Sequence, residues 1–158
     1  MPDFAYLTIG LAVGSLLTCI ALYKAAPGMM LIEDTIDLSI EDALSKLEKS
    51  ATNMGWIVPK VHMISESVKN AGYDVRPVAV LELCHPKLAG MMLNDEKGRR
   101  IAPMMPCRVA LYENADGTIT VSRMNSGMMS KMFGGIIASG MDEAADQNEE
   151  IFASILGK

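Results

Sequence analysis

The chain has 158 residues, a length that accommodates one ordinary domain and a short appendage but not two full domains. Half of the residues are hydrophobic and 21% are charged, which excludes an intrinsically disordered protein. The net charge is -5, so the chain has no general attraction for phosphate backbones, and we expect no nucleic-acid partner. Three cysteines are too few for a disulfide-rich scaffold.

An uncharged apolar run from Phe4 to Tyr23 lies near the start of the chain. As a helix it has a length of about 30 Å, the thickness of a hydrocarbon core. A cleaved signal peptide should begin with Lys or Arg, whereas this chain begins Met-Pro-Asp, and a buried core helix seldom lacks a polar face. We therefore expect an uncleaved, single-pass transmembrane helix in the plasma (inner) membrane. Lys24 is the only basic residue next to this run. The distribution of positive charge therefore does not determine on which side of the membrane the rest of the chain lies.

Gly10 and Gly14 form a GxxxG motif within this run. Small residues on one helical face let a second helix approach closely, so we expect the membrane, a protein partner or a second copy of the chain to contact this helix. Small residues are also common in spans that never pair. Residues 25–28 contain the helix breaker Pro27 and are predicted to link an anchor, residues 1–28, to one domain, residues 29–158.

The domain shows alternating predicted strands and helices, and their order predicts an α+β fold with a largely antiparallel sheet covered by helices. A turn at residues 114–117 predicts a β-hairpin. The predicted elements, in chain order, are a strand at 29–36, a helix from Ser39 to Gly55, a strand at 56–61, a short helix at 65–71, a strand at 75–83, a helix at 86–94, a hairpin of strands at 107–112 and 118–124, an apolar helix over 128–137 that Gly140 ends, and a last helix from Asp142.

Three segments carry a family resemblance: LSIEDALSKLEKSATNMGW, VLELCHPKLAGMML and IAPMMPCRVALYENADG. The stretch from Thr35 to Asp116 resembles the domain-of-unknown-function 302 family, and the continuation SRMNSGMMSKMFGG is similar to members that carry an N-terminal anchor. The resemblance implies a small domain with a curved antiparallel sheet covered by helices, similar to half of a TATA-binding-protein-like fold. It implies no established activity.

Soft donor atoms gather in two segments, Cys84-His85-Pro86 and Met104-Met105-Pro106-Cys107-Arg108. Cys84 is predicted to end one strand and Cys107 to begin another, and the resemblance implies that both segments border the same sheet. Thiols, an imidazole and thioethers suit haem iron, copper or zinc better than magnesium or calcium. The candidate metal ligands are Cys84, His85, Met104, Met105 and Cys107. A redox-active or persulfide-handling thiol pair and purely structural cysteines remain as alternatives, since buried cysteines are common and no CxxC or CxxCH motif is present.

Met128, Met129 and Met132 recur at helical spacing beside Phe133. Methionine side chains adapt to partner surfaces, so this Met-rich helix is predicted to pack or to bind a protein partner, and copper binding is the less favoured interpretation. The leading functional hypothesis is a single-span membrane-anchored accessory protein of a redox or sulfur-handling membrane system, with haem or a soft metal as candidate cofactor. The alternatives are a purely structural subunit of a membrane complex and a small thiol-dependent enzyme with Cys84 or Cys107 as nucleophile.

Overall fold

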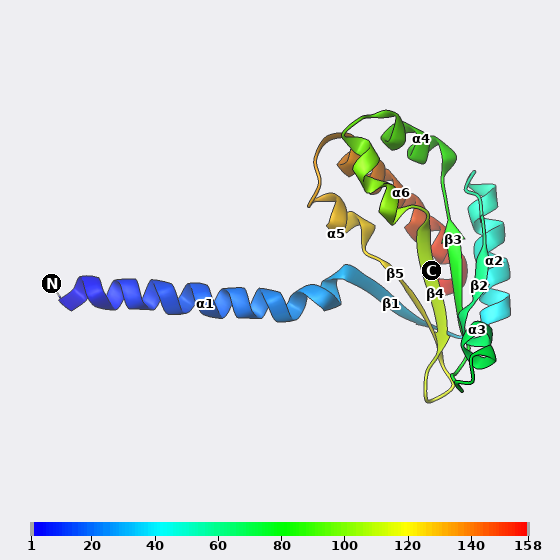
Figure 1. Cartoon of the computed structure of the whole chain (residues 1–158), viewed down its shortest axis with the longest axis horizontal. Coiled ribbons are helices and arrows are strands. Elements are labelled where there is room, and N and C mark those ends of the chain that lie inside the picture. Colours follow the sequence, from blue (N-terminus) through cyan, green and yellow to red (C-terminus); the bar gives the residue numbers. More distant parts are fainter. Residues whose placement is uncertain (1, 158) are drawn as a thin grey trace.

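Five strands form one antiparallel sheet in the order β1-β5-β4-β3-β2. The structure is a computed structural model that describes residues 2–157 (Figure 1). The predicted α+β fold with an antiparallel sheet and helices is confirmed. The elements are α1 (Pro2–Met30), β1 (Leu31–Ile36), α2 (Ile40–Asn53), β2 (Val61–Met63), α3 (Ile64–Asn70), β3 (Val78–Leu83), α4 (Pro86–Asn94), the 3₁₀ helix η1 (Gly98–Met104), β4 (Cys107–Glu113), β5 (Ile119–Met124), α5 (Ser126–Ser130) and α6 (Gly135–Leu156).

The core lies between the sheet and the two long helices α2 and α6. Side chains alternate along β3, so that Ala79, Leu81 and Leu83 are fully buried while their neighbours are only partly covered. Leu47 of α2 is fully buried on the facing surface. Each such leucine contributes about 1.5–3 kcal/mol relative to exposure, so this interface supplies much of the stability of the domain.

The predicted start of α2 is confirmed by its cap. The Ser39 hydroxyl oxygen accepts a hydrogen bond from the backbone N–H of Asp42 at 3.0 Å and donates to the Asp42 carboxylate at 2.9 Å. This contact satisfies one of the N–H groups that a helix start leaves without an internal partner. The cap fixes where α2 begins and hence which of its faces meets the sheet.

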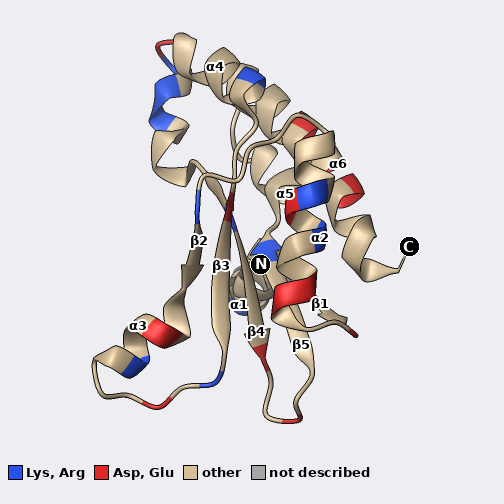
Figure 2. Cartoon of the chain, turned by 90° about the vertical axis from the view of Figure 1, so that its right-hand side faces the viewer, with Lys and Arg blue, Asp and Glu red and all other residues tan. Residues whose placement is uncertain are grey.

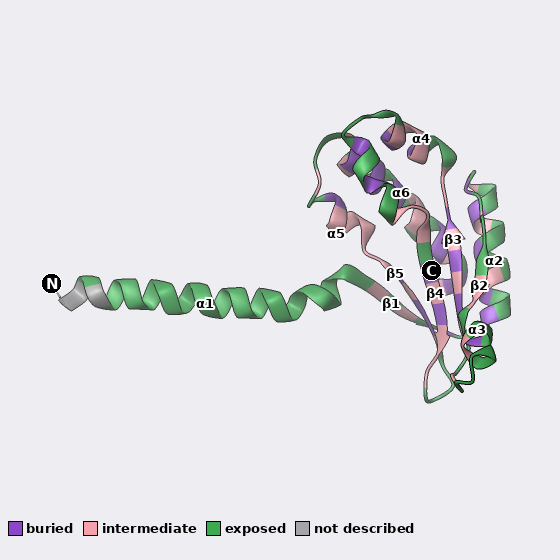
Figure 3. Cartoon of the chain, in the orientation of Figure 1, coloured by how far each residue is buried: buried purple, intermediate pink, exposed green. Residues whose placement is uncertain are grey.

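Helix α1 projects from the domain and is exposed along its described length (Figure 3). Residues Tyr6–Met30 are long and apolar enough to cross a membrane, a property that signal sequences share. The predicted linker at residues 25–28 is wrong, because α1 continues through Pro27 to Met30 and Leu31 opens β1 directly. The end of the helix is held by Asn125, whose side-chain amide donates to the Met29 carbonyl at 3.1 Å and whose backbone N–H donates to the Met30 carbonyl at 2.8 Å.

The predicted helix end at Gly140 is also wrong, because α6 runs unbroken from Gly135 to Leu156. Gly140 is a point of close approach, since a Cβ atom there would lie 2.7 Å from the Met92 sulfur of α4. The single apolar helix predicted over 128–137 is divided instead into α5 and the start of α6, separated by residues 131–134. Glycine therefore marks tight helix packing at this position and not a C-terminal stop.

Smaller differences concern element boundaries. The strand predicted at 56–61 lies instead at Val61–Met63, and Ile57 makes only an isolated bridge to Cys84. The strand predicted from residue 75 begins at Val78, just after Pro77, whose ring cannot donate to a sheet ladder. The predicted loop over 96–105 contains the 3₁₀ helix η1.

The substitution Gly98→Ala should destabilise the domain. Gly98 donates its backbone N–H to the Asp95 carboxylate at 2.7 Å, and a Cβ atom at this position would overlap the carbonyl of Met92. Overpacking of this kind costs about 1–3 kcal/mol, which corresponds to a drop in Tm of about 3–9 °C for a chain of this size. Circular dichroism of the full chain in mild detergent measures the change. Gly90→Ala in α4 is the matched control, because a Cβ there meets open space among the described residues and should stabilise the helix by about 0.5–1 kcal/mol. Equal effects of the two substitutions would contradict the packing argument.

Candidate functional site

Two cavities meet at Cys107, at the end of the sheet where β3 stops and β4 starts. Leu83 pairs with Cys107 in the sheet, which places Cys84 one residue beyond the pairing. The smaller cavity has a volume of about 40 Å³. Its lining residues are Trp56, Cys84, His85, Leu88, Ala89, Met92, Met105, Cys107 and Ala144. The structure thus brings together four of the five candidate ligands, while Met104 packs against the hydrophobic core outside this lining.

Backbone hydrogen bonds hold both cysteines in place. The N–H of Cys84 donates to the Ile57 carbonyl at 3.0 Å, and the Ile57 N–H donates back to the Cys84 carbonyl at 2.8 Å. Cys107 is the first residue of β4 and follows a cis Met105–Pro106 peptide bond. Both thiols therefore project from rigid strand ends toward one small space.

Burial disfavours the thiolate form of both cysteines. It raises the pKa of the Cys84 thiol above its ordinary value. The pKa of Cys107 is raised first by burial and then by the charge of a Cys84 thiolate, with a small opposing effect from a backbone hydrogen bond. The charge of either thiolate disfavours ionisation of the other, so the two thiols interact within the site.

His85 acts as a cap for α4 within this site. Its Nδ1 accepts a hydrogen bond from the Leu88 backbone N–H at 3.4 Å, and its ring packs edge-on against Trp56 with centroids 5.4 Å apart. The indole N–H of Trp56 in turn donates to the Gln147 side chain of α6 at 2.8 Å. His85 therefore caps α4, and this hydrogen bond occupies one of its two ring nitrogens.

The volume and the lining residues of the smaller cavity limit which cofactors it can hold. A space of about 40 Å³ holds little more than a water molecule, so it does not accommodate haem. Among residues 2–157, no group of three or more His, Cys, Asp or Glu side chains is arranged to hold a metal ion. The ligand set of a structural zinc site is therefore not assembled here. Two thiolates, from Cys84 and Cys107, are a ligand set that suits a soft ion such as copper(I).

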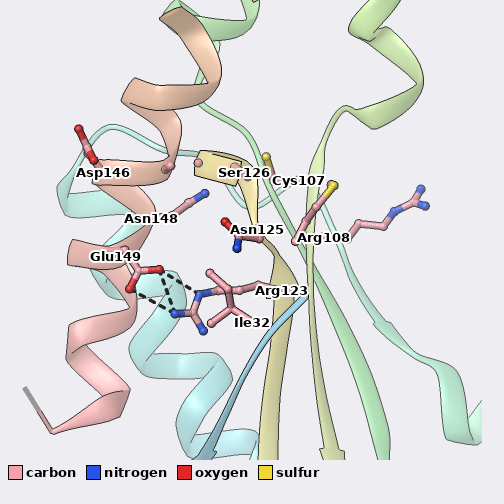
Figure 4. A pocket seen from close by; sticks show the side chains of 12 residues that line it. Ile32, Cys107, Arg108, Arg123, Asn125, Ser126, Asp146, Asn148 and Glu149 are labelled. Carbon is pink, nitrogen blue, oxygen red and sulfur yellow. Dashed lines mark hydrogen bonds and ion pairs between the residues drawn. The ribbon is translucent and has the colours of Figure 1, made fainter. Parts of the chain in front are cut away.

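The larger cavity, of about 240 Å³, lies between the sheet, the start of α5 and α6 (Figure 4). Arg123 lines this cavity and is only 6% exposed. Its guanidinium donates to the Asp34 carboxylate at 2.7 Å and to the Glu149 carboxylate at 2.9 Å. The Arg123 guanidinium also lies 4.4 Å from the centre of the Phe152 ring. Both partners are carboxylates, so the arginine is charge-compensated inside the domain. The lining residues are Ile32, Cys107, Arg108, Arg123, Met124, Asn125, Ser126, Gly127, Ala145, Asp146, Asn148 and Glu149.

One polar atom in this wall lacks a partner. The side-chain oxygen of Asn148 is buried and accepts no hydrogen bond from any residue of the described chain. Asn125 and Ser126, close by in Figure 4, supply further polar groups. Cys107 is the residue that lines both cavities, so its thiol borders an apolar pocket on one side and a polar one on the other.

Some of these residues had a signal in the sequence and others had none. Arg123 shares a strand face with Ile119 and Val121, and a charged residue on an apolar face indicates a buried ion pair. Asn148 and Glu149 sit in a polar stretch of α6 that predicts only a solvated surface. Arg108 points to the face opposite Cys107 and lies 3.8 Å from the Glu82 carboxylate, as expected for a surface ion pair.

The predicted interaction residues lie apart from the two cavities. Gly10 and Gly14 are exposed on α1, and added Cβ atoms would meet nothing within 4 Å in the described part of the chain. Met128 and Met129 of α5 are half-buried, while Met132 is 74% exposed. Neither group contributes a side chain to the site around Cys107.

Residues 32–156 match the family model described as "Domain of unknown function DUF302", and the chain belongs to this family. The structure is similar to the crystal structure of an uncharacterized conserved DUF302 protein from Bacillus stearothermophilus, with a TM-score of 0.72 and 19% sequence identity. The match covers 80% of this chain and 98% of that chain. At this identity the likeness shows the fold alone. No curated protein sequence matches the chain.

The variant Cys84→Ser should lower the pKa of Cys107. The serine removes the neighbouring charge that raises this pKa, while the burial of Cys107 persists. Because the thiolate is the reactive form, the midpoint of the alkylation rate of Cys107 against pH should move to lower pH. Mass spectrometry after iodoacetamide treatment, in a Cys19→Ser background, follows each cysteine separately. The background protein with both thiols present is the control, and an unchanged midpoint would show that the two groups do not interact.

Proposed function

We propose that this DUF302 protein is a single-span membrane-anchored accessory protein of a redox or sulfur-handling membrane system, in which Cys84 and Cys107 act as one dithiol. The observation that carries the proposal is that both thiols line the same small cavity and that the charge of one raises the pKa of the other.

The chemistry proposed is thiol–disulfide exchange. The Cys84 thiolate attacks a disulfide of a partner protein, and one partner sulfur leaves as a thiolate. The Cys107 thiolate then attacks the sulfur of Cys84 in the mixed disulfide and releases the second partner sulfur. The dithiol loses two electrons and two protons, and the partner gains them as it becomes a dithiol. Raised thiol pKa values make this exchange slow at neutral pH and faster as the pH rises.

The anchor is the second part of the proposal. Helix α1 has the length and composition of a single-pass span of the plasma (inner) membrane, and its exposed apolar surface is unfavourable in water. Tyr6 and Tyr23 lie near the two ends of its uncharged run, at depths where aromatic rings favour the interface. An anchor of this kind supports a role beside other membrane proteins.

The relation of the sheet to other folds is also a proposal. Long helices on one face of an antiparallel sheet support a similarity to half of a TATA-binding-protein-like fold. We propose this as a similarity of shape without DNA binding, because the net charge of -5 opposes contact with a phosphate backbone.

The dithiol proposal predicts a reversible disulfide between Cys84 and Cys107. The full chain with Cys19→Ser is incubated in glutathione buffers of increasing oxidised fraction, quenched with acid and alkylated. Intact mass and peptide mapping should show one internal disulfide and the loss of both free thiols together. In Cys84→Ser or Cys107→Ser the remaining thiol should instead carry a mixed disulfide with glutathione. Independent glutathionylation of both cysteines in the parent protein would contradict the proposal.

The two thiols could instead serve to bind a soft metal ion. Protein extracted from its native membrane would then contain copper, with both thiols protected from alkylation until the metal is removed. Visible absorption of that material tests for haem. The thiol-dependent enzyme, with Cys84 or Cys107 as a single nucleophile, is the alternative to a dithiol that acts as one unit.

A second candidate function, a structural subunit of a membrane complex, is favoured by the open face of α1. The substitutions Gly10→Leu and Gly14→Leu should each reduce the size of the complex in mild detergent, because the added side chains prevent close helix approach. Size-exclusion chromatography with light scattering measures the change. Ala12→Leu, on another face of the same helix, is the matched control and should leave the size unaltered. If all three variants behave alike, the motif has no role in assembly.

A further inference from the structure

The junction between α1 and the domain fixes the direction in which α1 leaves. Asn125, just before α5, holds the carbonyls of Met29 and Met30 through its side chain and its backbone N–H. Leu31 begins β1 with no intervening residues, and α1 contacts α5. Figure 1 shows α5, and the turn that follows it, on the side of the domain from which α1 projects. If α1 spans a bilayer, this side faces the same bilayer.

Apolar side chains are exposed on this side. Met29, Met30 and Leu31 at the junction are 47%, 44% and 50% exposed. In the turn of residues 131–134, which we call the α5–α6 turn, Met132 is 74% exposed. A flexible apolar side chain held this openly beside the end of an apolar helix matches the interfacial zone of a lipid bilayer.

Positive charge lies next to the same turn. Lys97, Arg99 and Arg100 are exposed at the start of η1, in the segment that follows α4 in Figure 2. The Arg100 guanidinium lies 5.8 Å from the centre of the Phe133 ring, which ties this segment to the α5–α6 turn. The turn adds the exposed Lys131.

The nearby acidic groups leave this charge only partly compensated. The Asp95 carboxylate accepts from the Gly98 N–H, and Glu96 lies 3.6 Å from Arg99 at the surface. The Asp142 carboxylate accepts from the Ser130 hydroxyl just before the turn. Four cations against three carboxylates still leave a positive surface on a protein whose net charge is -5. This local reversal of sign indicates a preference for an anionic partner.

We propose that the α5–α6 turn and the start of η1 dock onto anionic lipid headgroups of the bilayer that α1 spans. Met132 enters the interfacial zone, and the surrounding Lys and Arg side chains pair with lipid phosphates. The inference rests on the proposed membrane anchor, because without it α1 would not bring this side to a bilayer. A lipid surface is favoured over a protein partner because the apolar side chains continue those of α1 itself.

The test uses the full chain in nanodiscs with lipids brominated in the acyl chain near the headgroup, which quench tryptophan on contact. Three single variants each add a reporter: Met132→Trp at the α5–α6 turn, Leu16→Trp within α1, and Tyr73→Trp after α3. Tyr73 is 69% exposed, and α3 lies on the far side of the domain in Figure 1, so its variant is the matched negative control. The native Trp56 is buried, and its signal in the parent protein is subtracted.

We expect quenching at positions 16 and 132 but not at 73. Quenching at 16 with none at 132 would overturn the docking and leave the anchor intact. Absence of quenching at both would overturn the docking together with the anchor on which it depends. Equal quenching at 73 and 132 would show contact without orientation, which also contradicts the proposal.

Charge reversal tests whether the contact depends on anionic headgroups. In nanodiscs with anionic lipid, adding Lys97→Glu and Lys131→Glu to the Met132→Trp variant should lower the quenching of its reporter to about half. The control pair Lys46→Glu with Lys49→Glu changes the same charge on the exposed surface of α2 and should have no effect. Quenching that is equal in anionic and zwitterionic discs, and unaltered by the first pair, would show lipid contact that does not depend on charge and would overturn the recognition of anionic headgroups.

Discussion

The buried ion pairs of Arg123 connect the parts of the domain that would otherwise be held only by apolar contact. From β5 the guanidinium reaches Asp34 on the edge strand β1 and Glu149 on α6, and it stacks over Phe152. An arginine this deeply placed requires its partners, since an uncompensated buried charge is strongly destabilising. Asp34 is the better shielded partner, with 30% of its side chain exposed against 54% for Glu149, whereas Glu149 accepts from both the Nε and an Nη of the guanidinium. The edge strand that follows α1 is thereby fixed to the centre of the fold.

Burial also decides what the two cysteines can do. The same desolvation that raises their pKa values protects them from unselective oxidation, because oxidants react with the thiolate. Such a pair reacts only when a base removes a proton from a thiol, or when a cation or a specific partner stabilises the thiolate. Cys107, at the border of an apolar and a polar cavity, can be approached from the polar side without exposing the core.

Much of the fold was predictable because its signals are local. Alternation along β3, the Ser39 cap and the hairpin turn each specify structure within a few residues. The errors at Pro27 and Gly140 have the opposite origin. Asn125 supports the end of α1 from a distant part of the chain, and Met92 makes Gly140 a packing contact, so neither is visible in a window of sequence. The candidate site divides in the same way. The family resemblance implied that both cysteine segments border one sheet, and the predicted strand ends agreed with it. The polar residues of α6 join the larger cavity only because that helix packs across the sheet, which periodicity does not reveal.

The continuous passage from α1 into β1 joins the helix directly to the sheet, with no flexible linker between them. A flexible tether would let the domain tumble above a membrane, whereas a helix held at its last two carbonyls transmits its own rotation to the sheet. The face of α1 that carries Gly10 and Gly14 therefore has a set orientation about the helix axis relative to the cavity at Cys107. If α1 spans a bilayer as proposed, a helix that packs against that face determines which neighbour the two thiols meet.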